Sequence, residues 1–229
     1  MGYYGIDIYY IVLVLPAILL SLYAQMKVKS TFAKYSKIFS ARGVTGEETA
    51  RTILRGNGIN DVTVHPVAGQ LTDHFDQRNR SIGLSQPVYG SSSVAAIGVA
   101  AHESGHAIQH SVGYAPIKIR NSILPVANIG SQAAMPMAIL GLIFGMPMLV
   151  NAGIILFSAV VLFQVATLPV EFNASRRALA ILESSYTLSP EELKGAKKVL
   201  SAAALTYVAA MLTSLMSLLR LILITRNRD

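Results

Sequence analysis

The residues best suited to chemistry are the two histidines and the glutamate of His102-Glu103-Ser104-Gly105-His106. Residues four apart lie on one face of a helix, about 6 Å apart along its axis. Two imidazoles at that spacing can bind one Zn²⁺, and the glutamate beside the first histidine can take a proton from water. The motif therefore predicts His102 and His106 as metal ligands and Glu103 as a general base.

A motif this short also occurs by chance, and the alternative is two surface histidines on an amphipathic helix. The residues before the motif, 94–101, are all small or β-branched and apolar. Three serines, Ser91 to Ser93, precede them and are good N-cap residues. This pattern favours a buried helix that begins near residue 94 and carries the motif.

A catalytic zinc ion needs three protein ligands and an open position for water. The chain has no cysteine, so the third ligand must be a histidine or a carboxylate. On a straight helix His110 lies about 12 Å along the axis from His102, too far to share one ion. His65 and His74 have no ligand spacing. Glu171 is the best candidate, because an uncharged hairpin returns it to the membrane surface that the metal helix leaves. A helix-capping role is its alternative.

The elements that must position these residues are membrane helices. Only 14% of residues are charged, against about 25% in an average soluble domain. Residues 8–26, 121–170 and 199–219 contain no charge at all. About 20 apolar residues cross a bilayer, so these runs predict spans near 8–26, 124–146, 148–168 and 199–219. Pro147 and the Asn151-Ala152-Gly153 cluster predict the turn between the two middle spans.

The spans divide the chain into five expected parts. Residues 1–26 form an uncleaved N-terminal transmembrane anchor, because no basic residue precedes the apolar run and no cleavage site follows it. Residues 27–120 form the catalytic domain, 121–168 a transmembrane hairpin, 169–198 the segment with the third ligand, and 199–229 a C-terminal transmembrane helix and tail. We expect 169–198 to be helical in two parts, the second opened by Ser189-Pro190.

Within 27–120, residues 45–58 predict a short helix with a capping box of Thr45 and Glu48. The runs VTVHPV and SIGLS predict two short strands, a candidate hairpin, with the polar DHFDQRNR between them. An edge strand beside the metal helix would either hold an extended peptide substrate or only cover the helix. The residues favour neither of these two roles.

Basic residues set the expected orientation. The formal charge is +7, and 16 of the 19 Lys and Arg residues lie in 27–120 and 169–198. The positive-inside rule places those two stretches in the cytoplasm, with the N-terminus outside. Three C-terminal arginines, Arg220, Arg226 and Arg228, disagree, since four spans would put them outside; the fourth segment is alternatively interfacial or re-entrant. No nucleic-acid-binding motif is present, so we expect a lipid bilayer and no nucleic acid as partner.

Two stretches, GVAAHESGHAIQH and LPVEFNASRRAL, with the apolar hairpin between them and DHFDQRNRSIGLS before them, resemble the YugP-type neutral zinc metallopeptidases of bacterial membranes. These are distantly similar to membrane gluzincins of the HtpX type. The resemblance covers nearly the whole chain. It implies a mainly α membrane protein with about four transmembrane helices and a small α+β gluzincin-like cytoplasmic catalytic domain. It also implies Zn²⁺ bound by His102, His106 and Glu171, with Glu103 as general base.

The chain departs from the HtpX-type pattern E-x-x-A-D at one position, since Ser175 stands in place of the aspartate after Glu171. In those enzymes the aspartate orients a ligand histidine, and the candidates for that role here are Asn173 and Ser175. The residue that stabilises the oxyanion is not identified by the sequence. Its candidates are Tyr89, His110, Tyr114, Arg176 and Arg177.

The expected function is a membrane-anchored zinc endopeptidase of the bacterial plasma membrane, acting on polypeptides, membrane proteins among them, near the cytoplasmic face. One alternative is an intramembrane protease whose HExxH lies in a span, but the apolar run before His102 is short and the later spans lack aspartate. Another is a non-catalytic scaffold with a structural or vestigial metal site. The intact Glu103 argues against it, because structural zinc needs no base.

Overall fold

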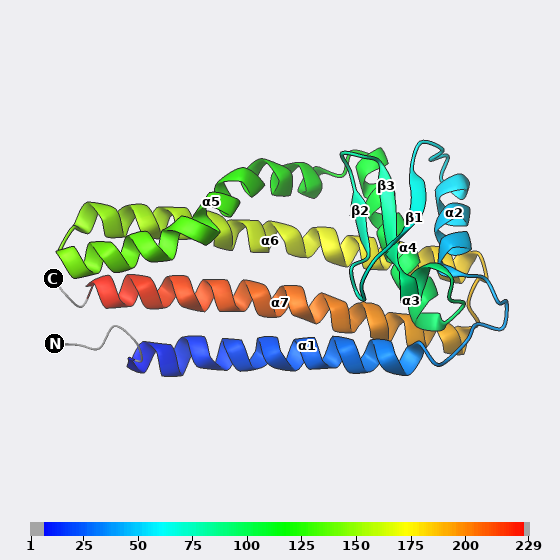
Figure 1. Ribbon diagram of the computed structural model, residues 1–229, viewed down its shortest axis with the longest axis horizontal. Coiled ribbons are helices and arrows are strands. Elements are labelled where there is room, and N and C mark those ends of the chain that lie inside the picture. Colours follow the sequence, from blue (N-terminus) through cyan, green and yellow to red (C-terminus); the bar gives the residue numbers. More distant parts are fainter. Residues whose placement is uncertain (1–6, 227–229) are drawn as a thin grey trace. The chain divides into compact units, whose positions relative to one another are not determined.

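The computed structural model describes residues 7–226 and is mainly helical (Figure 1). Residues 1–6 of the expected anchor, and 227–229 of the expected tail with Arg228, lie outside the described residues. The elements in chain order are a π-helical turn (Tyr10–Val14), α1 (Leu15–Tyr35), α2 (Gly46–Gly56), β1 (Thr63–Val67), β2 (His74–Asp76), β3 (Ser81–Ser85), α3 (Gln86–Tyr89), α4 (Val94–Ser111), α5 (Ala115–Phe144), α6 (Pro147–Ser184) and α7 (Pro190–Arg226).

The chain forms two compact units. Of the described residues, the membrane unit comprises 7–25, 118–168 and 206–226, and the globular unit comprises 26–117 and 169–205. Within residues 7–226, four helices are long and apolar enough to cross a membrane: α1 with the turn before it, α5, α6 and α7. The prediction of a mainly α membrane protein with about four spans and a small α+β region is therefore confirmed. Among the described residues, α4 is not one of these spans, which counts against an HExxH motif inside the membrane.

In the membrane unit, α5 and α6 form the predicted hairpin, but its turn comes earlier than the sequence suggests. The chain reverses at Gly145 and Met146, where Gly145 has a φ of +63°. The predicted turn cluster around Asn151 lies inside α6. Its Gly153 packs against α5, since an added Cβ would lie 2.7 Å from the Ala134 carbonyl oxygen. Small residues commonly serve such close helix contacts in membranes, so this glycine is a packing residue and not a turn residue.

The other two spans are joined by polar contacts in the membrane unit. The hydroxyls of Ser21 on α1 and Thr213 on α7 lie 3.0 Å apart. Arg220, which the sequence analysis placed directly after the fourth span among the arginines that disagree with the predicted orientation, makes an ion pair of 2.6 Å with Asp7. Pairing reduces the cost of placing a charge in an apolar environment. Helix α7 is continuous, which argues against the re-entrant alternative.

The segment 169–198 is helical in two parts, as the sequence suggests, and each part is continuous with a long apolar helix. Helix α6 continues through Pro169 and ends at Ser184, and α7 begins at Pro190 and continues to Arg226. Ser189 caps α7 as predicted, because its Oγ accepts from the Glu192 backbone N–H while the Glu192 carboxylate accepts from the Ser189 N–H. Proline at 169 therefore does not end the helix, as it often does not in membrane helices.

The globular unit contains a three-stranded sheet in the order β1-β3-β2. The expected hairpin of VTVHPV and SIGLS is wrong, because β1 and β3 are parallel. The antiparallel partner of β3 is β2, formed by His74, Phe75 and Asp76 within the polar stretch taken as a spacer. The sequence missed β2 because three residues are too few to show an alternating pattern.

The core of the globular unit lies between the sheet and the helices. Ile82 and Leu84 of β3, Ile97 of α4 and Leu182 of α6 are fully buried there. Helix α2 has the predicted capping box, in which Thr45 and Glu48 satisfy each other's backbone N–H groups. This core brings α4 and the second half of α6 together, and these two helices carry the candidate site.

Candidate metal centre

Helix α4 presents the two histidines of the motif. It begins after Ser93, whose Oγ accepts a hydrogen bond of 3.2 Å from the Ala96 N–H, as expected of an N-cap. The first half of the helix is almost entirely buried. Because the helix is regular and packed over this length, His102 and His106 lie on one face, with their rings in edge contact at 4.7 Å between centroids.

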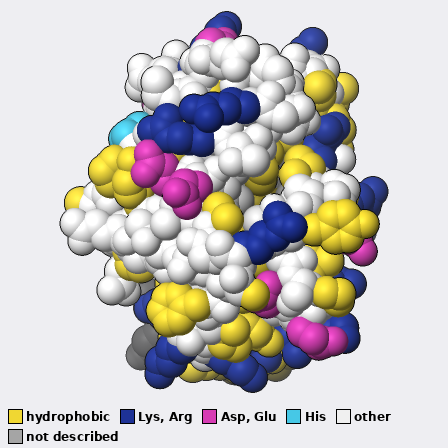
Figure 2. Space-filling view, turned by 90° about the vertical axis from the view of Figure 1, so that its right-hand side faces the viewer, with side chains coloured by type: hydrophobic (Ala, Val, Ile, Leu, Met, Phe, Trp, Pro, Cys, Tyr) yellow, Lys and Arg dark blue, Asp and Glu magenta, His cyan; other side chains and the backbone are white. Residues whose placement is uncertain are grey.

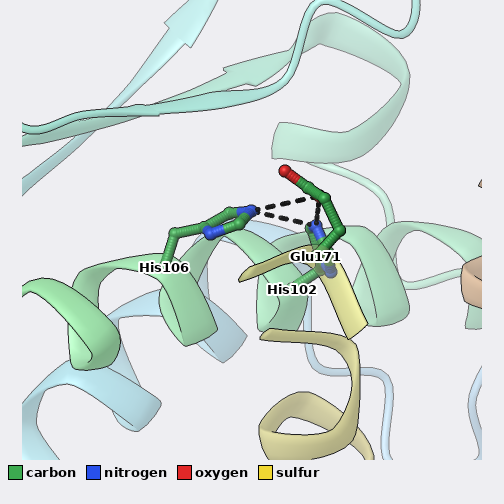
Figure 3. Close-up of side chains that lie close together, drawn as sticks. All are labelled: His102, His106 and Glu171. Carbon is green, nitrogen blue, oxygen red and sulfur yellow. Dashed lines mark hydrogen bonds and ion pairs between the residues drawn. The ribbon is translucent and has the colours of Figure 1, made fainter. Parts of the chain in front are cut away.

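Glu171, on α6, lies beside these two histidines (Figure 3). Its Oε2 lies 3.4 Å from Nε2 of His102 and 3.5 Å from Nε2 of His106. The two Nε2 atoms are 3.2 Å apart. The three donor atoms thus form a nearly equilateral triangle. The two histidines are four residues apart in the chain, and Glu171 is 65 or more residues from both.

The triangle fits a zinc ion. Zinc–ligand bonds of about 2.0–2.1 Å at the tetrahedral angle place neighbouring donor atoms about 3.3–3.4 Å apart. Oε2 of Glu171 is buried and, among the described residues, accepts no hydrogen bond. Two neutral imidazoles and one carboxylate are also the donor set of catalytic zinc sites. No fourth His, Asp or Glu of the described part of the chain joins this group, which leaves a coordination position open.

A second set of polar side chains orients the histidines. Nδ1 of His102 lies 3.1 Å from Oγ of Ser175. Nδ1 of His106 lies 3.0 Å from Oε1 of Gln109. An amide oxygen only accepts, so His106 carries its proton on Nδ1 and leaves the lone pair of Nε2 toward the centre. Ser175, at the position of the aspartate in the HtpX-type pattern, therefore contacts His102, whereas Asn173 contacts Gln109 and Arg177.

Gln109 is the site residue that the sequence analysis missed. It is fully buried, and its Nε2 donates to the Val170 carbonyl oxygen at 2.7 Å and to Oδ1 of Asn173 at 3.0 Å. Because a backbone carbonyl only accepts, this bond fixes which end of the amide faces His106. The available signal was a glutamine three residues after His106 on the buried face of an apolar helix, where a polar side chain needs partners.

Asn173 is held in turn by Arg177, whose Nε donates to Asn173 Oδ1 at 2.8 Å. Arg177 thus lies at the end of a chain of hydrogen bonds that runs through Asn173 and Gln109 to His106. Its guanidinium supports the ligand geometry from α6. This contact indicates a positioning role for Arg177.

The electrostatics of the centre follow from its two carboxylates. Burial alone would lower the pKa of His106, but the adjacent Glu171 carboxylate and the charge of Glu103 outweigh it and raise that pKa. Glu103 is itself buried, with 8% of its surface exposed. A carboxylate held close to the metal ligands in a site with little water is suited to accept a proton.

Close packing of α4 on α6 depends on Gly105 inside the motif. A Cβ added there would lie 2.7 Å from the Ala174 carbonyl oxygen. Any side chain would force the two helices apart. Glycine at this position therefore allows Glu171 to approach both histidines.

The remaining sequence candidates lie outside the triangle. His110 is exposed and makes an edge contact with the Phe75 ring, at 5.8 Å between centroids, as expected for a histidine too far along the helix. His65 and His74 are exposed on the sheet, and Arg176 is exposed on α6. Tyr89 is hydrogen-bonded to Glu47. Tyr114 lies beyond the end of α4 and is half-buried.

Comparisons with known proteins identify the family of the chain. A family model described as "Putative neutral zinc metallopeptidase" matches residues 10–226. The "Putative membrane protease YugP" of Bacillus subtilis (strain 168) is 52% identical over 218 residues, which cover 95% of this chain and 97% of that protein. No solved structure matches. The chain therefore belongs to the zinc metallopeptidase family that this model describes.

Proposed function

We propose that the protein is a membrane-anchored zinc endopeptidase that cleaves polypeptides close to the cytoplasmic face of a bacterial plasma membrane. The observation that carries the proposal is the triangle of donor atoms from His102, His106 and Glu171, with sides of 3.2 to 3.5 Å. Three ligands and an open position are the arrangement of catalytic zinc, whereas structural zinc is closed by four protein ligands.

The residues of the centre have separate tasks. Zinc, when bound, supplies Lewis-acid activation of water and of the scissile carbonyl. Glu103 accepts the proton of the attacking water and returns it to the leaving nitrogen. Ser175 and Gln109 hold the imidazoles of His102 and His106 with their Nε2 lone pairs toward the ion.

The sheet offers a place for the substrate backbone. Strand β2 is an edge of the sheet and contacts α4, where Phe75 touches His110. Edge strands bind extended peptides through their unpaired N–H and C=O groups. We infer that β2 holds the substrate chain beside the metal centre.

The proposed location rests on charge. The globular unit carries 14 of the 19 Lys and Arg residues, nine in residues 26–117 and five in 169–205. The positive-inside rule supports a cytoplasmic globular unit. Because this unit continues directly into apolar helices, its substrates are expected to be proteins at or in the membrane.

The proposal is tested on the purified full chain in an uncharged detergent. Zinc content is measured by inductively coupled plasma mass spectrometry, and cleavage of casein is measured with and without a chelator. We expect about one zinc per chain, loss of cleavage on chelation and recovery on adding zinc back. Cleavage by fully metal-free protein would refute the proposal, and zinc-loaded protein that cleaves neither casein nor membrane-protein substrates would favour the scaffold alternative.

A further inference from the structure

A basic cavity of about 800 Å³ lies in the globular unit, on helices α1 and α7. Five lysines line it, namely Lys27, Lys34, Lys194, Lys197 and Lys198, and no Asp or Glu does. This cavity contains no residue of the metal centre and has no role in the proposed peptide hydrolysis.

Two helical stripes face each other across the cavity. On α1 the lining residues are Lys27, Ser30, Thr31, Lys34 and Tyr35, spaced three and four apart. On α7 they begin at Lys194 and continue at the same spacing to Leu205. Residues with this spacing share one face of a helix, so both helices direct charged and hydroxyl side chains into one space.

The positive charge in the cavity is poorly compensated by the protein. Lys194 pairs with Glu191 at 2.9 Å, and Lys34 lies over the Tyr35 ring at 5.6 Å. Among the described residues, no carboxylate is within ion-pair distance of Lys27, Lys197 or Lys198. Several ammonium groups around one cavity repel each other, and an anion bound between them removes that repulsion.

The place of the lysines along the helices identifies the anion. Lys27 is the first charged residue after the uncharged run 8–26 of α1, and Lys198 is the last before the uncharged run 199–219 of α7. Lys27 and Lys198 therefore lie where α1 and α7 leave the apolar layer of the bilayer. This placement holds for either orientation of the protein in the membrane. This is the depth of lipid headgroups, where juxtamembrane lysines attract anionic lipids.

The lining of the cavity matches one lipid molecule better than a free ion. Lysines and the hydroxyls of Ser30, Thr31 and Ser201 suit a phosphate group, since lysine binds phosphate as a point charge. Ala202 and Leu205, toward the apolar part of α7, offer contact to an acyl chain. We propose that this cavity binds the phosphate headgroup of an anionic phospholipid.

The test uses the purified full chain in an uncharged detergent and native mass spectrometry to count retained ligands. Three probes are compared: dioctanoyl-phosphatidylglycerol, dioctanoyl-phosphatidylcholine and inorganic phosphate. The variant Lys27→Gln/Lys197→Gln/Lys198→Gln removes three cavity charges. The variant Lys29→Gln/Lys37→Gln/Arg55→Gln removes three exposed charges outside the cavity and is the matched control. Circular dichroism checks that both variants are folded.

We expect one phosphatidylglycerol to be retained in preference to phosphatidylcholine. Each lysine near a membrane surface contributes about 1 kcal/mol to anionic lipid binding, so losing three should weaken retention about a hundredfold. The control variant should retain the lipid as the unchanged chain does. Equal loss in both variants would overturn the proposal in favour of diffuse surface charge. Equal retention of phosphatidylcholine, or retention of inorganic phosphate without lipid, would also overturn it.

Discussion

The side-chain amide of Gln109 donates a hydrogen bond of 2.7 Å to the backbone carbonyl of Val170, the residue directly before Glu171. The amide oxygen of the same side chain accepts a hydrogen bond from His106 on α4. Gln109 thus connects the two helices that carry the proposed ligands. The position of the third ligand relative to the first two is set by this residue. Loss of the bond should affect metal affinity before it affects folding of the membrane helices.

Replacement of Gln109 by leucine is expected to weaken zinc binding about 10- to 100-fold, as is typical when a partner of a ligand histidine is removed. The measurement is competition between the protein and a zinc-binding dye. Ser104→Ala is the control, since Ser104 is also buried in α4 but donates only to the Ala100 carbonyl oxygen. Equal affinity of the Gln109 variant and the unchanged chain would show that Gln109 does not position the centre.

Replacement of Glu103 by glutamine should leave zinc bound and lower peptide cleavage by about a hundredfold or more, because an amide cannot accept the water proton. Zinc content and casein cleavage are measured on the same preparation. Full activity in a zinc-loaded Glu103→Gln protein would remove the general-base role.

Glu171→Ala is expected to lose both zinc and activity, because it removes one of three protein ligands. His110→Ala should keep about one zinc per chain, since its ring contacts Phe75 and lies outside the donor triangle. Both are measured by metal analysis after gel filtration. A metal-free His110→Ala protein beside a loaded Glu171→Ala protein would reverse the ligand assignment.

Gly105→Ala should disturb the centre although it adds only a methyl group. The new Cβ would lie 2.7 Å from the Ala174 carbonyl oxygen, and overpacking of this kind costs about 1–3 kcal/mol. We expect lower thermal stability and weaker zinc binding. Gly98→Ala, on the same helix, meets Ala196 at an ordinary 3.4 Å and should change neither. A Gly105→Ala protein with unchanged zinc affinity would show that α4 and α6 can separate without loss of the site.

Orientation in the membrane is tested with single introduced cysteines. The chain has no native cysteine, so a thiol reagent can label only the introduced residue. Lys37→Cys and Ser184→Cys, both exposed in the globular unit, should resist an impermeant thiol reagent in intact cells. Met146→Cys, in the turn of the α5–α6 hairpin and 52% exposed, should react. Labelling at both globular positions would place the site outside the cytoplasm.

The sequence predicted well what depends on local pattern. The helical spacing of His102 and His106 and the uncharged runs each correspond to elements of the structure. Glu171 was found because the hairpin length limits where the chain can return. Gln109 was missed because its role depends on contacts with Val170 and Asn173, more than 60 residues away, which no local pattern encodes.

The wrong sequence predictions concern residue types and patterns that occur in more than one structural role. Gly153 indicates a turn or a close helix contact, and only the packing against Ala134 decides between them. The sequence predicts a span that ends near residue 168 and a separate helical segment after it, but α6 runs through both without a break. The parallel pairing of β1 with β3 is a long-range feature that strand patterns do not specify.

The separation of Glu171 from the motif along the chain has a consequence for biogenesis. During synthesis, the histidines of α4 are made before α5 and α6, and Glu171 lies in the second half of α6. A nascent chain that ends before Glu171 carries only two of the three proposed ligands. The proposed metal centre can therefore form only after α5 and the first half of α6 have been synthesised.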